Sequence, residues 1–149
     1  MIEWLILALS LAGLIISLYF TFAYYGRIKK SRWIPEILCA REGSSCVTVV
    51  QTPYARVFGM PNFLLGILYY AGLIIWLVLR NATWHRNHWM SYLFALTSLW
   101  ILAASVVSVP VGIYLIYALR WKLRISCLLC YTVHAINLVL VFLLMVEGV

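Results

Sequence analysis

Four long apolar runs restrict the possible folds of this chain more than any other feature of its sequence. An α-helix needs roughly 20 consecutive apolar residues to cross a hydrocarbon core of about 30 Å. Stretches of that order occupy residues 2–25, 62–79, 91–119 and 125–145. Because 66% of the 149 residues are hydrophobic and only 10% are charged, a water-soluble fold could not cover this apolar surface with polar groups. We therefore expect an integral membrane protein.

The fold class follows from the backbone of these runs. Every backbone N–H and C=O group within a bilayer must find its hydrogen-bond partner inside the protein, and a helix provides these partners within one segment. The sequence thus predicts an all-α fold, a four-helix transmembrane bundle that forms a single domain over residues 1–149. The third run is longer than a span requires and contains Pro110 and Gly112, so we expect that helix to tilt, kink or project beyond the bilayer.

The connection over residues 26–61 is much longer than the usual link between neighbouring helices, and loops of such length commonly carry function. Aromatic and aliphatic residues are interspersed there with polar ones, which suits a segment that lies on the membrane surface and caps one end of the bundle. The loop contains Cys39 and Cys46, separated by AREGSS, whose glycine and serines favour a readily bent chain. We expect this loop to cover a functional site.

All four cysteines occur in two close pairs, Cys39 with Cys46 in the loop and Cys127 with Cys130 at the start of the fourth run. Because successive helices alternate in direction, we expect the two pairs to lie on the same side of the membrane. A C-x-x-C pair at a helix N-terminus is reactive, since free N–H groups and the helix dipole stabilise a thiolate, foremost that of Cys127. Two such dithiols can pass electrons by thiol–disulfide exchange.

Two other interpretations of the cysteines are open at this point. A single cysteine in a membrane helix is commonly a small, buried, apolar residue. Four thiolates could also bind zinc, although the six residues between Cys39 and Cys46 exceed the spacing of the usual zinc knuckles. The paired arrangement favours a redox relay over both, and we expect no metal site.

One face of the fourth helix carries polar groups over several turns. At about 100° per residue, an arc of about 80° contains Cys127, Cys130, His134 and Asn137. Hydrogen-bonding groups inside a membrane usually face the bundle interior and indicate a functional site. For His134, a hydrogen bond to a neighbouring helix is about as plausible as contact with a ligand, whereas Asn137 is expected to be structural. Asn62 begins the second helix, where it can act as an N-cap and also face the site, because the two roles are compatible.

A dithiol at a membrane boundary needs a redox partner that reaches it from the lipid. A lipid quinone meets this requirement, because an apolar pocket with a few polar anchors is what such a ligand needs. The sequence contains no nucleotide-binding fingerprint, haem motif or P-loop that would indicate another cofactor, and no nucleic-acid partner is expected.

These features together resemble the vitamin K epoxide reductase family, including its bacterial and archaeal disulfide-forming members. The resemblance extends over the whole chain and rests on Cys39, Cys46 and the stretches TPYARVFGMPNFLLGILYY and CLLCYTVHAIN. It implies a quinone-linked thiol oxidase in which Cys130 faces the quinone and Cys127 exchanges with Cys46. It also implies that Cys39 takes electrons from a thioredoxin-like partner, which we expect to be a separate protein because the 149 residues contain no fused thioredoxin-like domain.

The same resemblance implies which groups bind a quinone of the menaquinone or ubiquinone type. Asn62 matches the asparagine that hydrogen-bonds one quinone carbonyl in the family, and Thr52 and Tyr54 match loop positions that cover the pocket. His134 stands where vertebrate members have a tyrosine that contacts the opposite carbonyl. A histidine ring nitrogen can also donate a hydrogen bond, so we expect ligand selectivity to depend on this residue.

The leading prediction is an enzyme that oxidises the dithiol of a partner protein, generates disulfides and reduces a lipid quinone. The same four cysteines could also serve a vitamin K epoxide or quinone reductase driven by partner thiols, in which the reduced ligand rather than the partner disulfide is the useful product. A membrane module that binds a metal through thiolates and His134 is the alternative from a different class of protein.

Lys and Arg residues are distributed unevenly between the two expected sides of the membrane. Nine lie on the side of the cysteines, namely Arg27, Lys29, Lys30, Arg32, Arg41, Arg56, Arg120, Lys122 and Arg124. The other side has only Arg80 and Arg86. By the positive-inside rule, this bias predicts a prokaryotic cell-membrane protein whose active site faces the cytoplasm, opposite to the placement usual in the family. Intracellular disulfides are common in hyperthermophiles, which suits this orientation, whereas contacts with anionic head groups are the alternative role for these basic residues.

Overall fold

The computed structural model of the chain describes residues 1–25, 49, 51–57, 59–83 and 88–148. The predicted all-α membrane fold is confirmed, because four helices in this part are long and apolar enough to cross a membrane. They are α1 (Ile2–Tyr24), α3 (Asn62–Thr83), α4 (His88–Tyr117) and α5 (Leu128–Glu147). Each helix exposes large apolar side chains on its outer surface, among them Ile15, Ile75, Ile113 and Phe142. The chain is an integral membrane protein.

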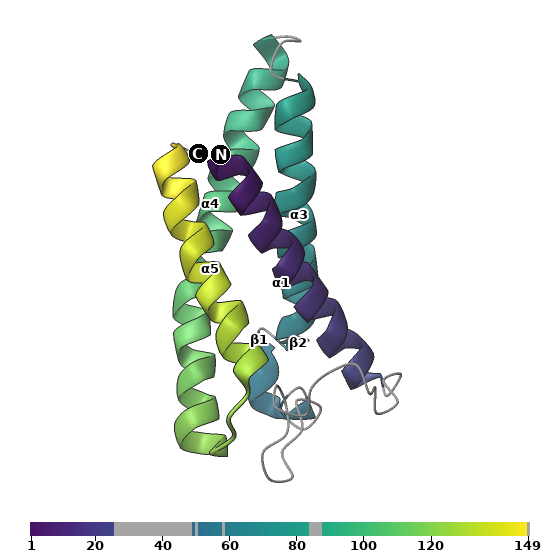
Figure 1. Cartoon of the computed structure of the whole chain (residues 1–149), viewed down its shortest axis with the longest axis vertical. Coiled ribbons are helices and arrows are strands. Elements are labelled where there is room, and N and C mark those ends of the chain that lie inside the picture. The colour runs from purple at the N-terminus through teal and green to yellow at the C-terminus, as the bar shows by residue number, and fades with distance from the viewer. Residues whose placement is uncertain (26–48, 50, 58, 84–87, 149) are drawn as a thin grey trace.

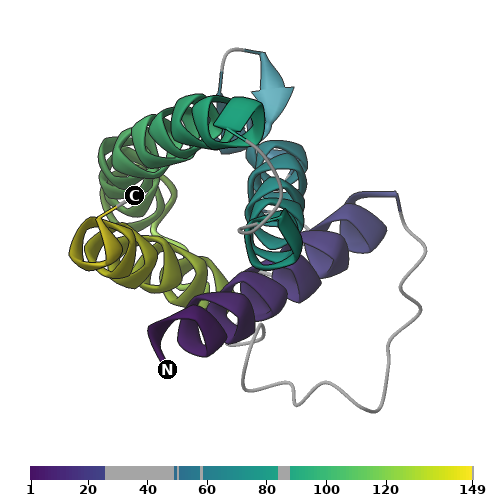
Figure 2. The same cartoon turned by 90° about the horizontal axis from the view of Figure 1, so that it is seen from above.

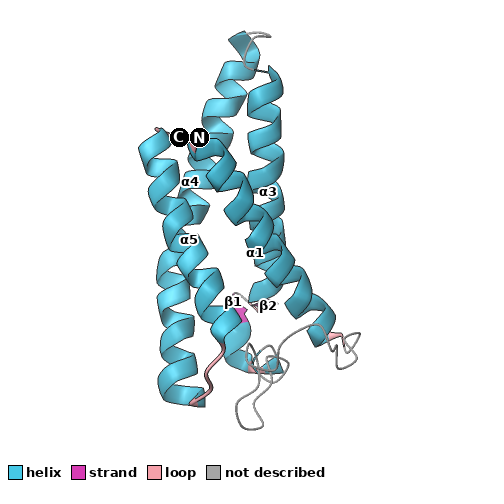
Figure 3. Ribbon diagram, viewed as in Figure 1, coloured by secondary structure: helices cyan, strands magenta, loops and turns pink. Residues whose placement is uncertain are grey.

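Four short elements lie at one end of the bundle. A 3-10 turn, η2 (Pro53–Ala55), leads into two paired antiparallel strands, β1 (Arg56–Val57) and β2 (Met60–Pro61), and β2 runs directly into α3. At the C-terminal end of α4, the chain continues as a π-helix, η3 (Ala118–Leu123). The last turn of α1, the first turn of α3, η3 and the first turn of α5 therefore meet at this same end, which we call the cysteine end (Figures 1 and 3).

The four long helices form a ring in the order α1, α3, α4, α5 when the bundle is viewed along its length (Figure 2). Each helix contacts its two neighbours in that ring, and α1 closes it by packing on α5 as well as on α3. Helices α3 and α4 extend past the start of α1 and the end of α5, as Figure 1 shows. The long third apolar run thus belongs to a helix that projects beyond α1 and α5.

Several helix boundaries differ from the ranges expected from the sequence, and α3 continues to Thr83, four residues past its apolar run. Helix α4 starts at His88 and passes through Pro110 without interruption before it changes to the π-helix η3. Helix α5 starts at Leu128, three residues later than its apolar run, because Cys127 has an extended backbone and acts as the N-cap. The Sγ atom of Cys127 accepts a hydrogen bond from the backbone N–H of Cys130 at 3.3 Å, which satisfies one of the free donors of the first turn.

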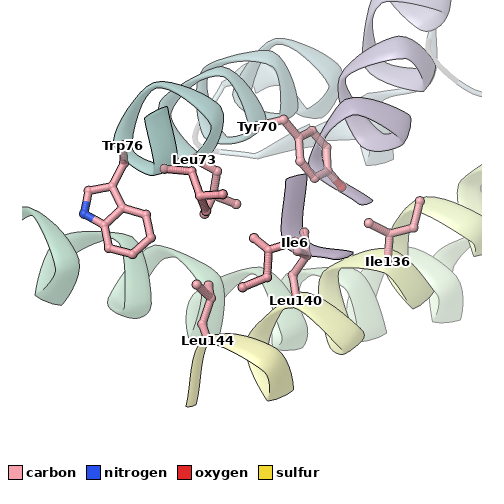
Figure 4. Packing of buried hydrophobic residues seen from close by; sticks show 8 residues of the cluster. Ile6, Tyr70, Leu73, Trp76, Ile136, Leu140 and Leu144 are labelled. Atoms are coloured by element: carbon pink, nitrogen blue, oxygen red, sulfur yellow. The ribbon is translucent and has the colours of Figure 1, made fainter. Parts of the chain in front are cut away.

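A cluster of buried side chains from α1, α3 and α5 fills the middle of the bundle (Figure 4). Ile6 of α1 packs there with Leu73 of α3 and Leu140 of α5, and all three side chains are fully buried. Tyr70 joins this cluster and donates a hydrogen bond from its hydroxyl to Oδ1 of Asn137 at 2.5 Å. This bond ties α3 to α5 within the membrane-spanning region and gives the buried amide oxygen of Asn137 a partner.

A second polar link joins α3 and α5 at the end opposite the cysteines. Arg80 of α3 forms a salt bridge with Glu147 of α5, with Nη1 and Oε2 3.2 Å apart. The guanidinium of Arg80 also lies over the ring of Trp76, with its carbon 5.3 Å from the ring centroid, a cation–π geometry. The last turn of α5 is therefore held against α3.

Candidate functional site

A cavity of about 570 Å³ lies inside the cysteine end of the ring and continues between the helices. Its walls are mainly apolar side chains of α1, α3, α4 and α5, together with the segment that precedes α3. Five of the residues predicted from the sequence border it: Thr52, Tyr54, Asn62, Cys130 and His134. A largely apolar cavity with a few polar groups on its walls is the usual form of a site for a small organic ligand.

The two cysteines of the C-x-x-C pair have different surroundings. Cys127 and Cys130 form a disulfide, with their Cα atoms 5.3 Å apart. Cys130 borders the cavity. Cys127 is only 1% exposed and packs with Phe63 of α3 and with Val49. Cys130 therefore borders the cavity, whereas Cys127 is buried in a cluster that includes Val49 from the end of the long loop. The other predicted pair, Cys39 and Cys46, lies outside the described residues.

The reactivity of the pair depends on the hydrogen bonds made by Cys127. In the reduced dithiol, the hydrogen bond from Cys130 lowers the pKa of the Cys127 thiol. Burial opposes this effect, while hydrogen bonds from the backbone N–H groups of Cys130 and Leu129 add to it. These groups stabilise the thiolate, as expected for a cysteine at a helix N-terminus. Cys127 is thus the sulfur of this pair suited to attack a disulfide or to leave from one.

We predict that replacing Cys130 with alanine raises the pKa of Cys127, because the thiolate loses its largest stabilising hydrogen bond. In a variant with serine at positions 39 and 46, the ultraviolet absorbance of the reduced Cys127 thiolate should appear below the pH at which ordinary thiols ionise. The further change Cys130→Ala should move this titration to higher pH. A Cys127→Ser variant gives the baseline, and an unchanged titration after Cys130→Ala would contradict the assigned cause.

The segment before α3 brings two loop residues over the cavity. The hydroxyl of Thr52 donates to the carbonyl oxygen of Val49 at 2.7 Å, and the backbone N–H of Ala55 donates to the carbonyl oxygen of Thr52 at 3.1 Å. Gly59 adopts a left-handed φ of 80° in the turn between β1 and β2, a conformation that favours glycine. The hydroxyl hydrogen of Thr52 is thus used in the turn itself, and its oxygen can still accept a hydrogen bond from a ligand.

His134 and Asn137 differ in their hydrogen bonding although they lie on the same face of α5. Asn137 is bonded to Tyr70, in agreement with the structural role expected for it. The Nδ1 atom of His134 is buried and has no hydrogen-bond partner among the residues that the structure describes. A hydrogen bond from Nδ1 to a described neighbouring helix, one of the two roles considered for this residue, is therefore not formed.

Three further contacts at the site were not predicted from the sequence. Val49 packs beside Cys127, Tyr69 of α3 hydrogen-bonds Ser105 of α4 at 2.8 Å, and Gly112 of α4 contacts the ring of His134. The hydroxyl of Ser105 donates to the carbonyl oxygen of Ile101, so that Tyr69 is the donor to Ser105. All of these contacts join segments far apart in the sequence. Their only signal in the sequence is the small residues on α4, which permit a close approach of neighbouring helices.

Within the described residues, no group of three or more His, Cys, Asp or Glu side chains is close enough to bind a metal ion. A shared site of all four thiolates would involve Cys39 and Cys46, which lie outside that part of the chain.

A family model and two relatives that match this chain point to the same family. The model of the vitamin K epoxide reductase family matches residues 4–145. Vitamin K epoxide reductase complex subunit 1 of Mus musculus is 31% identical over 145 residues, covering 92% of this chain and 84% of that protein. Its counterpart from Rattus norvegicus is 32% identical over 139 residues, covering 88% and 81%. The resemblance found in the sequence is therefore confirmed, and the chain belongs to the vitamin K epoxide reductase family.

Proposed function

We propose that the protein oxidises the dithiol of a separate thioredoxin-like protein and transfers the electrons to a lipid quinone. Family membership makes the chain a membrane oxidoreductase with a redox-active cysteine pair. The observation that carries the finer proposal is the placement of that pair. Cys130 borders the apolar cavity, while Cys127 packs against the end of the long loop. A disulfide in this position can take electrons from one side and deliver them to the other.

The proposed sequence of steps conserves electrons and protons. The partner dithiol reduces a Cys39–Cys46 disulfide and is itself oxidised to a disulfide. The Cys46 thiolate then attacks Cys127, forming a mixed disulfide and releasing Cys130 as a thiolate. Attack of Cys39 on Cys46 restores the loop disulfide and leaves Cys127 reduced. Finally the Cys127–Cys130 dithiol returns to a disulfide, and its two electrons, with two protons, convert a quinone in the cavity to a quinol.

Chain connectivity supports the exchange between Cys46 and Cys127. Val49 is buried in the same cluster as Cys127 and is three residues after Cys46. Three residues of extended chain span about 10 Å at most. Cys46 can therefore stay near Cys127 while Val49 remains in place.

The polar groups of the cavity support a quinone as the oxidant. A quinone has two opposite carbonyl oxygens, each of which accepts hydrogen bonds. Asn62 and His134 both border the cavity and belong to different helices, and their side chains can supply one donor to each oxygen. We propose a menaquinone or a ubiquinone as the ligand, because the mainly apolar walls suit a lipid-borne ring.

An anaerobic assay tests the transfer of electrons from the partner dithiol to a quinone. The purified protein, a short-chain ubiquinone or menadione, and a reduced thioredoxin-like protein are mixed, and the quinone absorbance is followed. The proposal requires loss of one quinone for each partner disulfide formed. A vitamin K epoxide reductase driven by partner thiols is the second candidate, since the two relatives carry the name of that activity, and reduction of vitamin K epoxide by the reduced partner in the same assay would favour it. Stoichiometric zinc without quinone-dependent thiol loss would instead favour metal binding.

We also propose that the cysteine end faces the cytoplasm of a prokaryotic cell. The Lys and Arg bias supports this orientation, and four of the nine basic residues counted for the cysteine side, Arg56, Arg120, Lys122 and Arg124, lie in the described part of the chain at the cysteine end. On the opposite side, Arg80 is already engaged by Glu147. Lys and Arg residues near the ends of membrane helices tend to remain in the cytoplasm.

Labelling with a membrane-impermeant thiol reagent tests this orientation. In a variant with serine at positions 46, 127 and 130, Cys39 should be labelled only after the membrane is permeabilised. The matched control carries Asn81→Cys at an exposed position near the far end of α3, with serine at all four native cysteines, and should be labelled in intact cells. Ready labelling of Cys39 in intact cells would reverse the assigned orientation.

A further inference from the structure

We propose that Gly112 of α4 is a positioning residue for the ligand of the cavity. Because this position lacks a side chain, the imidazole of His134 can lie against α4 with its Nδ1 atom buried there. The other ring nitrogen, Nε2, is then oriented to donate a hydrogen bond to a ligand oxygen. The inference rests on the proposed function, since it concerns the ligand of the same cavity.

The contact between Gly112 and His134 is close. A Cβ atom built at Gly112 would lie 2.7 Å from Nδ1, 3.2 Å from Cγ and 3.5 Å from Cβ of His134. The distance to Cβ is an ordinary van der Waals contact, whereas the distances to Nδ1 and Cγ are too short for the ring and α4 both to stay in place. Gly112 therefore provides the surface on which the imidazole rests.

The hydrogen bonds of His134 determine which nitrogen can donate. A neutral imidazole has one N–H group and one nitrogen with a free lone pair. Nδ1 is buried and has no partner in the described part of the chain. A buried N–H without a partner is rarer in proteins than a buried acceptor without one, so the proton is better placed on Nε2. His134 borders the cavity, and Nε2 is the ring nitrogen that is not sealed against Gly112.

A methyl group at position 112 must change this arrangement. An atom 2.7 Å from Nδ1 is inside the contact distance of two unbonded atoms, so either the ring turns or α4 and α5 separate locally. Both responses redirect the Nε2–H group. The loss of one neutral hydrogen bond corresponds to about a 3- to 10-fold change in an equilibrium constant. Gly112→Ala should therefore weaken quinone binding by about this factor and raise KM more than it lowers kcat.

A double-mutant cycle tests whether Gly112 acts through His134. The dissociation constant of menadione is measured by quenching of tryptophan fluorescence, because Trp100 borders the cavity. The variants are Gly112→Ala, His134→Ala and the double variant. Each single change should weaken binding about 3- to 10-fold, and the double variant should bind no more weakly than His134→Ala. The matched control is Ala103→Val, which adds carbon atoms to an exposed position of α4 and should leave binding unchanged.

Thermal unfolding of the same variants keeps the proposal testable if Gly112→Ala folds poorly. Removing the imidazole also removes the clash, so the double variant should melt close to His134→Ala and above Gly112→Ala. Additive effects on binding, or a double variant as unstable as Gly112→Ala, would overturn the inference. So would wild-type affinity in the Gly112→Ala variant, without affecting the proposed function. A wild-type protein that neither binds nor reduces menadione would overturn both.

Discussion

Replacement of Cys130 with serine should abolish quinone reduction with every thiol donor, lowering turnover on the order of 1,000-fold or more. Cys130 is the cysteine of the pair that borders the cavity, and a serine hydroxyl in its place cannot form a disulfide with Cys127. Loss of Cys127 should have the same consequence. The measurement is the rate of quinone absorbance loss with dithiothreitol and, separately, with a reduced thioredoxin-like protein. Turnover that survives in Cys130→Ser would exclude this disulfide from the electron path.

The matched variant is Cys46→Ala, which separates the two halves of the proposed relay. Electrons from the protein partner should no longer arrive, whereas a small dithiol should still reach the Cys127–Cys130 disulfide. Turnover with dithiothreitol should therefore persist while turnover with the protein partner is lost. Full turnover with the protein partner in Cys46→Ala would contradict the relay through the loop.

Gly13→Ala should destabilise the protein although it adds a single methyl group. A Cβ atom at Gly13 of α1 would overlap the ring of Tyr70, which is 1% exposed and bonded through its hydroxyl to Asn137. The ring cannot move aside without breaking that bond, so α1 must shift. Overfilling of a packed core costs about 1–3 kcal/mol. The gain in helix propensity from glycine to alanine, about 1 kcal/mol, offsets part of this cost.

Gly72→Ala is the matched control for this stability measurement. It makes the same change within α3, but a Cβ atom there has no neighbouring atom within 4 Å. Gly72→Ala should thus show only the propensity gain, and the difference between the two variants isolates the clash with Tyr70. Both are measured by thermal or denaturant unfolding in the same detergent. Equal stabilities would show that α1 accommodates the methyl group without cost.

Composition and run length were sufficient to predict the class of the fold. Apolar runs long enough to cross a bilayer leave the backbone little choice but helix, so the membrane bundle could be expected before any contact was known. The ends of the helices were less predictable. The start of α5 depends on Cys127 acting as an N-cap, and the end of α4 depends on a change from α to π geometry, neither of which alters hydropathy.

The candidate site was predictable only as far as helical periodicity reaches. Periodicity places Cys130, His134 and Asn137 on one side of α5, and all three border the cavity. It does not show what the facing helices contribute. Tyr70 is 67 residues before Asn137 in the chain, and only the arrangement of the four helices in a ring brings their side chains together. The roles of Val49 and Gly112 depend on packing in the same way.

The two polar links between α3 and α5 have a mechanical consequence. They involve Asn137 and Glu147, and both lie C-terminal to the cysteine pair along α5. Helix α5 is thus anchored to α3 at its middle and at its C-terminal end, whereas the disulfide lies at its N-terminal end. When the disulfide opens or closes, the backbone displacement can be absorbed in the first two turns of α5. The remaining turns, and the core cluster that they complete, can then keep their positions throughout the redox cycle.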